Sequence, residues 1–477
     1  MITLPRLFPI VAVIVLAGCF LAGCAAKPSR QVASTNKAVA ALTARATGEV
    51  PFLRAWELQL PTPVECSWIS PNAPELVFFQ CADSHAIHCV EVRSGQTRWV
   101  TSPMAKQILG DAFVQRLRLL GERQNSSYIR DRLYFICDDT LVCLDVATGQ
   151  QVWHYDLPFA ASTGPLVAGE NDGSLRVFIG DWNNHIQVAT LESSKVVEQQ
   201  EQKQFPRIVW QMGVASVIRA TGLEHEGLCY FGDHEGNLLC FPLERELKWS
   251  VPTGGAIDGG ATVRDRSLYV GNDGNALHAL NRLTGERLGQ FNLTGAVKQR
   301  PFWFANEKQR LYVWVTGQTP GSTGLVALRV QPDNVPYTDP KRNPVEVVRM
   351  GQDWFLPGAT RLVSSTPLHL IVSDDNNSVL WAAHRGTGKV AWVWSLNLGW
   401  PGNDDGRSGA LVDHVLTYQD RSDALRTVIA SDNRGFVAAF TMFDYVPSLE
   451  QEASGITSRS IASDPKAAKP VAAPAAK

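Results

Sequence analysis

Seven of the nine cysteines lie beyond residue 50 of this 477-residue chain, and thiols can form disulfides, bind metal ions or act as nucleophiles. An odd number argues against a complete disulfide framework. Three of the seven align with alanines in related stretches of the chain, which predicts a buried position for a small side chain. A disulfide between Cys81 and Cys89 is the alternative. The three cysteines are Cys89, Cys143 and Cys240, and the alanines are Ala279, Ala327 and Ala382.

Histidines and acidic residues are the other candidates for metal ligands. His85, His88 and Cys89 could suggest zinc, but neighbours on a hairpin strand point to opposite faces, and no fourth ligand is evident. Acidic segments such as 233–237 and 272–275 lack the spacing and the final glutamate of an EF-hand. We interpret them as hairpin turns, and we predict no metal site, no cofactor and no catalytic residue.

The two remaining cysteines, Cys19 and Cys24, end a segment of secretory type. Residues 1–6 contain one Arg, residues 7–16 are almost wholly apolar, and each cysteine follows Leu-Ala-Gly. Both tetrapeptides resemble the bacterial lipobox, whose cysteine is lipidated and becomes the new N-terminus. We assign lipidation to Cys24, because the apolar run continues to Leu21 and ends after it. An uncleaved membrane helix over residues 7–26 is the alternative.

The ends of the chain differ in composition from its centre. Residues 24–50 are rich in Ala, Ser, Thr and Lys and predict a lipidated tether after a signal peptide over residues 1–23. Residues 448–477 form a tail of Ala, Ser, Pro and Lys that is too poor in large apolar residues to fold alone. With a net charge of −2 and no block of Lys and Arg, the chain is not expected to bind nucleic acid.

The elements that position these residues are predicted by an internal repeat over residues 51–447. Residues 268–281 place an Asp-Gly turn between two apolar runs, a strong hairpin signal, and Thr284-Gly285 then leads into a further strand. Related stretches recur, eight in all, at spacings of about 40 to 60 residues, which are typical of four-stranded propeller blades. We therefore predict an all-β, eight-bladed β-propeller.

Three of the repeats contain a sharper motif, in which a Thr-Gly or Ser-Gly turn precedes a tryptophan by four residues. Glycine supplies the positive φ of the turn, and tryptophan buries a large surface between blades. The motif resembles the repeat of pyrroloquinoline-quinone (PQQ) propellers. Its glycines and tryptophans are Gly95 and Trp99, Gly149 and Trp153, and Gly388 and Trp392.

The first strand of the repeat region stands outside the pattern. Residues 56–60 are similar to the last strand of a blade, although no repeat precedes them, and the C-terminal repeat ending at Phe440 lacks such a strand. We therefore predict that residues 54–60 complete the last blade and close the ring, which would remove an open sheet edge.

The resemblance to PQQ-type repeats covers about residues 51–446 and leads to two function classes, because fold alone does not decide function. Quinoprotein dehydrogenases hold PQQ and calcium over the propeller axis, but their adjacent cysteines and calcium ligands cannot be found here. Lipobox, tether and eight blades together resemble the outer-membrane assembly lipoprotein BamB family, which is non-enzymatic. The resemblance implies a periplasm-facing scaffold anchored in the outer membrane beside the β-barrel assembly machine.

A third class is a propeller that binds sugars or peptides. Trp354 and Phe355, and likewise Trp400, lie beside Pro and Gly just before the first strand of a blade, where loops gather on one face. We consider these three residues as partner-binding candidates. The alternative is that the tryptophans stack between blades.

Overall fold

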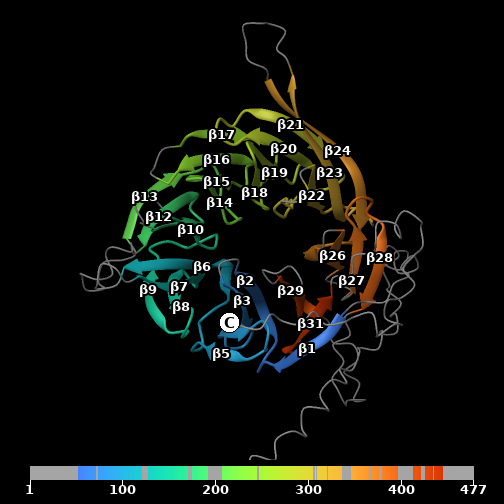
Figure 1. Ribbon diagram of the computed structural model, residues 1–477. Coiled ribbons are helices and arrows are strands. Elements are labelled where there is room, and N and C mark those ends of the chain that lie inside the picture. Colours follow the sequence, from blue (N-terminus) through green and yellow to red (C-terminus); the bar gives the residue numbers. More distant parts are fainter. Residues whose placement is uncertain are drawn as a thin grey trace, which may run out of the picture.

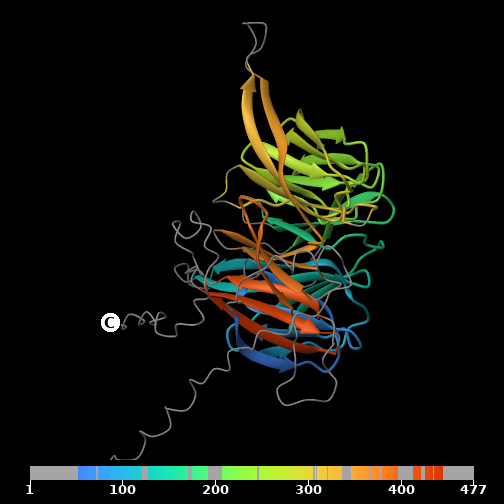
Figure 2. The ribbon, with the colours of Figure 1, turned by 90° about the vertical axis from the view of Figure 1, so that its right-hand side faces the viewer.

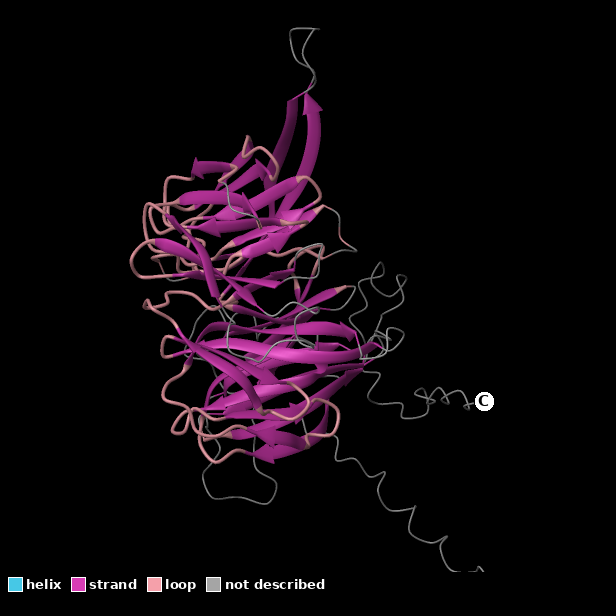
Figure 3. Cartoon of the chain, turned by 90° about the vertical axis from the view of Figure 1, so that its left-hand side faces the viewer, coloured by secondary structure: helices cyan, strands magenta, loops and turns pink. Residues whose placement is uncertain are grey.

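The computed structural model consists of strands and loops throughout the part of the chain that it describes, and no segment there could cross a membrane as a helix (Figure 3). Trp400, the proposed signal peptide, tether and tail, and the alternative membrane helix over residues 7–26 lie outside the described residues. Those residues are 52–70, 73–120, 127–169, 175–191, 207–243, 247–304, 307, 309–319, 321–335, 345–365, 368–374, 379–395, 412–419, 425–432 and 434–443.

Eight antiparallel sheets stand in a ring, which confirms the eight-bladed propeller (Figure 1). Each of the first four blades pairs four strands in chain order, from the axis to the rim. Blade one contains β2 (Val64–Ser70), β3 (Ala73–Cys81), β4 (Ile87–Glu91) and β5 (Thr97–Val100); blade two β6 (Ile108–Leu120), β7 (Ser127–Cys137), β8 (Thr140–Asp145) and β9 (Gln151–Asp156); blade three β10 (Leu166–Gly169), β11 (Leu175–Gly180), β12 (His185–Leu191) and β13 (Arg207–Gly213); blade four β14 (Leu223–His225), β15 (Leu228–Gly232), β16 (Asn237–Pro242) and β17 (Trp249–Pro252).

Blades five and seven repeat this order, whereas blade six has three strands, and isolated bridges from Ala296 and Phe302 take its innermost place. Blade five contains β18 (Ala261–Arg264), β19 (Ser267–Gly271), β20 (Ala276–Asn281) and β21 (Arg287–Asn292); blade six β22 (Arg310–Val315), β23 (Gly324–Val335) and β24 (Val345–Pro357); blade seven β25 (Arg361–Ser365), β26 (His369–Asp374), β27 (Val379–His384) and β28 (Val390–Ser395); blade eight β29 (Val412–Gln419), β30 (Leu425–Asp432) and β31 (Phe436–Phe443).

The ring closes as the sequence predicts. β1 (Phe52–Gln59) pairs antiparallel with β31 and becomes the outer strand of blade eight, so the two ends of the repeat region share one sheet (Figure 1). The backbone N–H of Leu60 also donates to the carbonyl of Gly435 at 2.8 Å. Blade eight therefore depends on both ends of the repeat region.

The core is divided into eight apolar clusters, one between each pair of neighbouring blades. Every blade lies between two others, so its middle strands are covered on both faces. β15 and β19 are accordingly buried at all five positions, whereas the outer strand β9 is at most half-buried. The blades differ mainly in how their outer strands fill the gap to the next blade.

Blade six carries a long two-stranded arm. β23 and β24 stay paired as far as Val335 and Val345, and the ribbon stands out from the ring (Figure 2). Val348 is buried in the cluster between blades five and six, and its carbonyl lies over Gly289 of β21. The base of the arm thus covers the outer edge of blade five.

Candidate functional site

The tryptophan predicted to separate blades does so by docking on the next blade. Trp99 of blade one lies over the turn of blade two, and its indole N–H donates to the carbonyl of Val146 at 2.7 Å. Gly149 in that turn has a φ of 71°, and a methyl group added there would lie 2.5 Å from the Trp99 ring. Glycine is needed at this turn for its backbone angle and for its missing side chain.

The same docking recurs around the ring. We call the outer-strand tryptophan that stands over the glycine of the next blade's turn the docking tryptophan. All four glycines have positive φ, including Gly95 and Gly388 of the predicted motif. The pairs are Trp56 with Gly95, Trp99 with Gly149, Trp249 with Gly285, and Trp354 with Gly388. Trp153 is half-buried against Tyr134, and the side chain of Trp392 lies outside what the structure describes.

Of the two interpretations of Trp354, the structure supports stacking between blades and contradicts exposure for partner binding. Trp354 is a docking tryptophan with 8% of its surface exposed, and its indole N–H donates to the carbonyl of Arg385 at 2.8 Å. It precedes the first strand of blade seven because it belongs to the long outer strand of blade six. Phe355, the next residue, is half-buried against the cluster between blades five and six.

The three cysteines predicted to occupy small buried positions do so. Cys89 and Cys143 pair across the ladder with the tryptophans Trp99 and Trp153, and Cys240 pairs with Trp249. Burial raises the pKa of Cys89 and of Cys240 to about 12, so both thiols stay protonated near neutral pH. None of the seven cysteines from Cys66 to Cys240 forms a disulfide, and the pair of Cys81 and Cys89 is therefore not bridged.

His85 and Asp233, which were both considered as metal ligands, lie at hairpin turns, as predicted for the acidic segments. Nδ1 of His85 lies 2.6 Å from the Glu65 carboxylate, and Asp233 accepts the backbone N–H of Asn237 at 2.7 Å across its hairpin turn. Within the described residues, no three His, Cys, Asp or Glu side chains come together as metal ligands.

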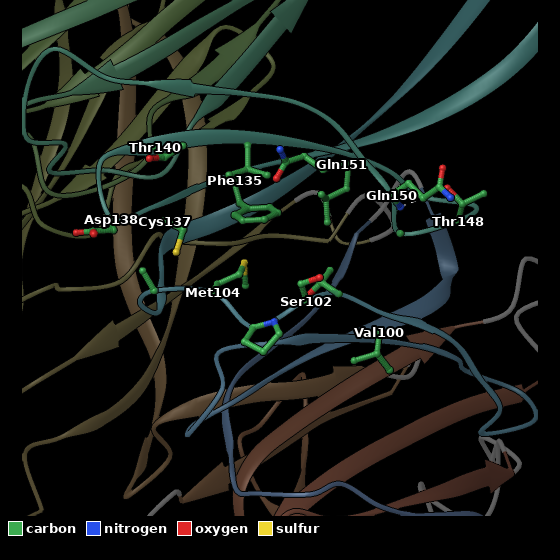
Figure 4. A pocket seen from close by; sticks show the side chains of 16 residues that line it. Val100, Ser102, Met104, Phe135, Cys137, Asp138, Thr140, Thr148, Gln150 and Gln151 are labelled. Atoms are coloured by element: carbon green, nitrogen blue, oxygen red, sulfur yellow. Dashed lines mark hydrogen bonds between the residues drawn. The ribbon is translucent and has the colours of Figure 1, made fainter.

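A groove of about 690 Å³ opens between blades one and two, where no sequence pattern indicated a site (Figure 4). Val100, Ser102 and Met104 form one wall, and the other is formed by β7 and β8 with the turn that follows them. Figure 4 shows Phe135, Thr140 and Gln151 along that second wall. The groove continues the apolar cluster between the two blades, which contains Phe135, Val142 and Leu144.

The groove exists because one residue is short and polar. Every second side chain of a blade's outer strand points at the next blade. The residue two positions after the docking tryptophan, or after its equivalent in the other blades, therefore normally fills the space between the two blades. In blade one that residue is Thr101, and its hydroxyl accepts the backbone N–H of Ile87 at 2.9 Å. Five other blades have apolar residues there, all packed in the interface: Leu58, Met212, Val251, Phe291 and Leu356.

One end of the groove is acidic. Asp138 and Asp139 form the tight turn between β7 and β8, and both are exposed with positive φ. Asp156 on β9 is exposed as well and accepts the hydroxyl of Thr140 at 3.1 Å. Lys106 binds Asp138, and this hydrogen bond raises the pKa of the lysine. The Asp139 carboxylate accepts the backbone N–H of Ala161 at 3.0 Å, so Asp138 and Asp156 are the carboxylates at this end of the groove.

The connections that enter blades four, five and six contact one another. A side-chain carbon added at Gly259 would lie 2.5 Å from the backbone of Gln299, so the connections entering blades five and six touch there. The guanidinium of Arg300 reaches across to blade four and donates to the carbonyl of Thr221 at 2.8 Å.

Comparison with known proteins supports the fold. No family model and no curated protein sequence matches the chain. Among solved structures, BamB from Moraxella catarrhalis is 15% identical with a TM-score of 0.53, and the match covers 83% of this chain and 99% of that one. The computationally designed Ika8 protein is 12% identical with a TM-score of 0.50, covering 82% and 99%.

A quinohemoprotein alcohol dehydrogenase from Comamonas testosteroni is 10% identical with a TM-score of 0.51, and the match covers 87% of this chain and 79% of that one. At these identities the likeness is one of fold.

Proposed function

We propose that this chain is a non-enzymatic, lipid-anchored scaffold that holds partner proteins at the periplasmic side of the outer membrane and serves the assembly of outer-membrane β-barrel proteins. The proposal divides the chain into a signal peptide (1–23), a tether lipidated at Cys24 (24–50), the propeller (51–447) and a tail (448–477). Its partners are the membrane, through the lipid, and proteins of the β-barrel assembly machine.

The observation that carries the proposal is the match in fold to BamB, which covers 83% of this chain and 99% of that one. The lipobox at Cys24 adds a membrane anchor that a soluble dehydrogenase would not need. The groove between blades one and two supports a binding role, because it is open and partly apolar.

A deletion strain tests the role in assembly. Steady-state amounts of outer-membrane β-barrel proteins are measured by mass spectrometry in the wild type, in the deletion strain and in a strain complemented with the full chain. We expect a decrease of about twofold or more in the deletion strain and recovery on complementation. Unchanged amounts in the deletion strain would refute the role in assembly.

A further inference from the structure

We propose that the groove between blades one and two binds an extended segment of a partner protein, which inserts one bulky apolar side chain and places a Lys or Arg at the acidic end. The inference rests on the proposed scaffold function and names the chemistry of its partner. It is carried by the shape of the groove, by the composition of its walls and by the charge at its end.

The shape of the groove follows from comparing Thr101 with the equivalent residue in the other blades. The position of Thr101 is filled elsewhere by a leucine, methionine, valine or phenylalanine from the blade's own outer strand, and blade two places Tyr155 there. Thr101 leaves that space open next to Phe135 and Val142, which are otherwise buried in the interface. The vacancy therefore has the size and polarity of a side chain that the fold accepts at the equivalent interfaces.

The walls suit an extended backbone on either side of that side chain. Val100 is 48% exposed and offers apolar surface at the rim. Ser102, Thr140 and Gln151 also line the groove, and their uncharged side chains can donate to and accept from peptide groups. Buried apolar anchors surrounded by a polar rim are the usual composition of a binding site for a protein segment.

The negative charge at one end of the groove favours a Lys or Arg beside the inserted side chain of the bound segment. Among the described cations, Lys106 alone pairs with Asp138 or Asp156 at their end of the groove, so a further cation arriving beside them gains attraction. His154 is the other titratable group on this face of β9, and its ring contacts Gln151. A segment with an acidic residue at this end would be repelled.

Peptide display tests the proposal without knowledge of the natural partner. A phage-displayed library of random dodecapeptides is selected on the full-length purified protein, and enriched peptides are synthesised and measured by fluorescence anisotropy. We expect enrichment of a bulky apolar residue near Lys or Arg. Thr101→Tyr fills the groove with the residue of blade two and should weaken binding at least about tenfold.

Two further variants serve as controls for Thr101→Tyr. Ser250→Tyr adds the same side chain at an exposed site on the outer strand of blade four and should bind like the wild type. Thr140→Tyr obstructs the groove from its opposite wall and should weaken binding even if Thr101→Tyr unfolds. Equal binding by wild type and both groove variants, or failure to enrich any peptide, would overturn the proposal.

The acidic end has its own test. Asp138→Asn together with Asp156→Asn keeps the shape of both side chains and should weaken the same peptides about threefold to tenfold while flattening their salt dependence. An unchanged salt dependence would remove the cationic requirement. Outer-membrane protein amounts in bacterial strains separate this proposal from the assembly role. If these amounts fall in the deletion strain but not in a strain that carries Thr101→Tyr, the proposed binding in the groove is wrong and the scaffold function stands.

Discussion

At the scale of single residues, the contact between tryptophan and glycine holds neighbouring blades together. Gly149 satisfies two demands at once, since its φ of 71° suits glycine and the Trp99 ring occupies the space of a side chain. Gly227 has a φ of 76° with nothing within 4 Å of an added methyl group. Comparison of the two glycines therefore separates the cost of a positive φ from the cost of a clash with the tryptophan ring.

We expect Gly149→Ala to lower the free energy of unfolding by about 3 kcal/mol and Gly227→Ala by about 1 kcal/mol, because only the first displaces a docked tryptophan. Chemical denaturation monitored by circular dichroism measures both. Equal losses would show that the backbone angle alone makes glycine necessary at the turn.

A half-buried histidine makes stability depend on pH. Burial lowers the pKa of His369 to about 4, with smaller effects from His384 and Arg385. The unfolded chain takes up this proton near pH 6.5, whereas the folded chain does so only near pH 4, so stability is lost as pH falls through that interval. The loss from this one group amounts to about 3 kcal/mol.

The variant His369→Phe keeps an aromatic ring beside His384, which it contacts in the wild type, and cannot take up a proton. Its free energy of unfolding should therefore fall less steeply than that of the wild type between pH 6.5 and pH 4. Urea denaturation at a series of pH values gives the comparison. Parallel profiles for the two proteins would contradict the assignment to His369.

At the scale of elements, β1 joins the two ends of the repeat region. It supplies Trp56, which docks on Gly95 of blade one, and it leads into Leu60, which is buried between blades eight and one. One strand thus completes blade eight and fills the interface to blade one. Loss of this segment would uncover the edge of β31 and remove two large apolar side chains, Trp56 and Leu60, from the interface.

Two truncations of the mature chain test the closure. Removal of residues 25–50 should leave the melting temperature nearly unchanged, because that segment precedes β1. Removal of residues 25–60 should destabilise the protein by several kcal/mol and promote association through the open edge. Differential scanning calorimetry and light scattering report the two effects. Equal melting temperatures for both truncations would refute a stabilising role for β1.

At the scale of the whole molecule, the proposed lipid anchor sets where the ring works. Metabolic labelling with palmitate should mark the wild type, and Cys24→Ala should abolish the label, whereas Cys19→Ala should keep it. Autoradiography of the immunoprecipitated protein reads out the label. Label lost with Cys19→Ala and kept with Cys24→Ala would move the lipid to the other lipobox. Label kept in both variants and in their double mutant would end the proposal of a lipoprotein.

Local sequence patterns were enough to predict the ring. The hairpin turns and the Thr-Gly motif repeat along the chain, so the number of blades could be predicted. Residues 56–60 match the last strand of a blade without a repeat before them, so the closure by β1 could be predicted as well. The small buried positions of Cys89, Cys143 and Cys240 followed from aligning the repeats. These features depend on near neighbours in the chain or on identical neighbours in the next repeat.

The surface left open between blades could be located only in the folded ring. Trp354 resembled an exposed loop residue because it precedes blade seven in the chain, but the end of β24 carries it into the interface. Thr101 looked ordinary, although its polarity two residues after Trp99 was a signal that comparison of outer strands could have found. The groove depends on what faces Thr101 across the blades, and such contacts between distant strands are fixed only when the ring closes.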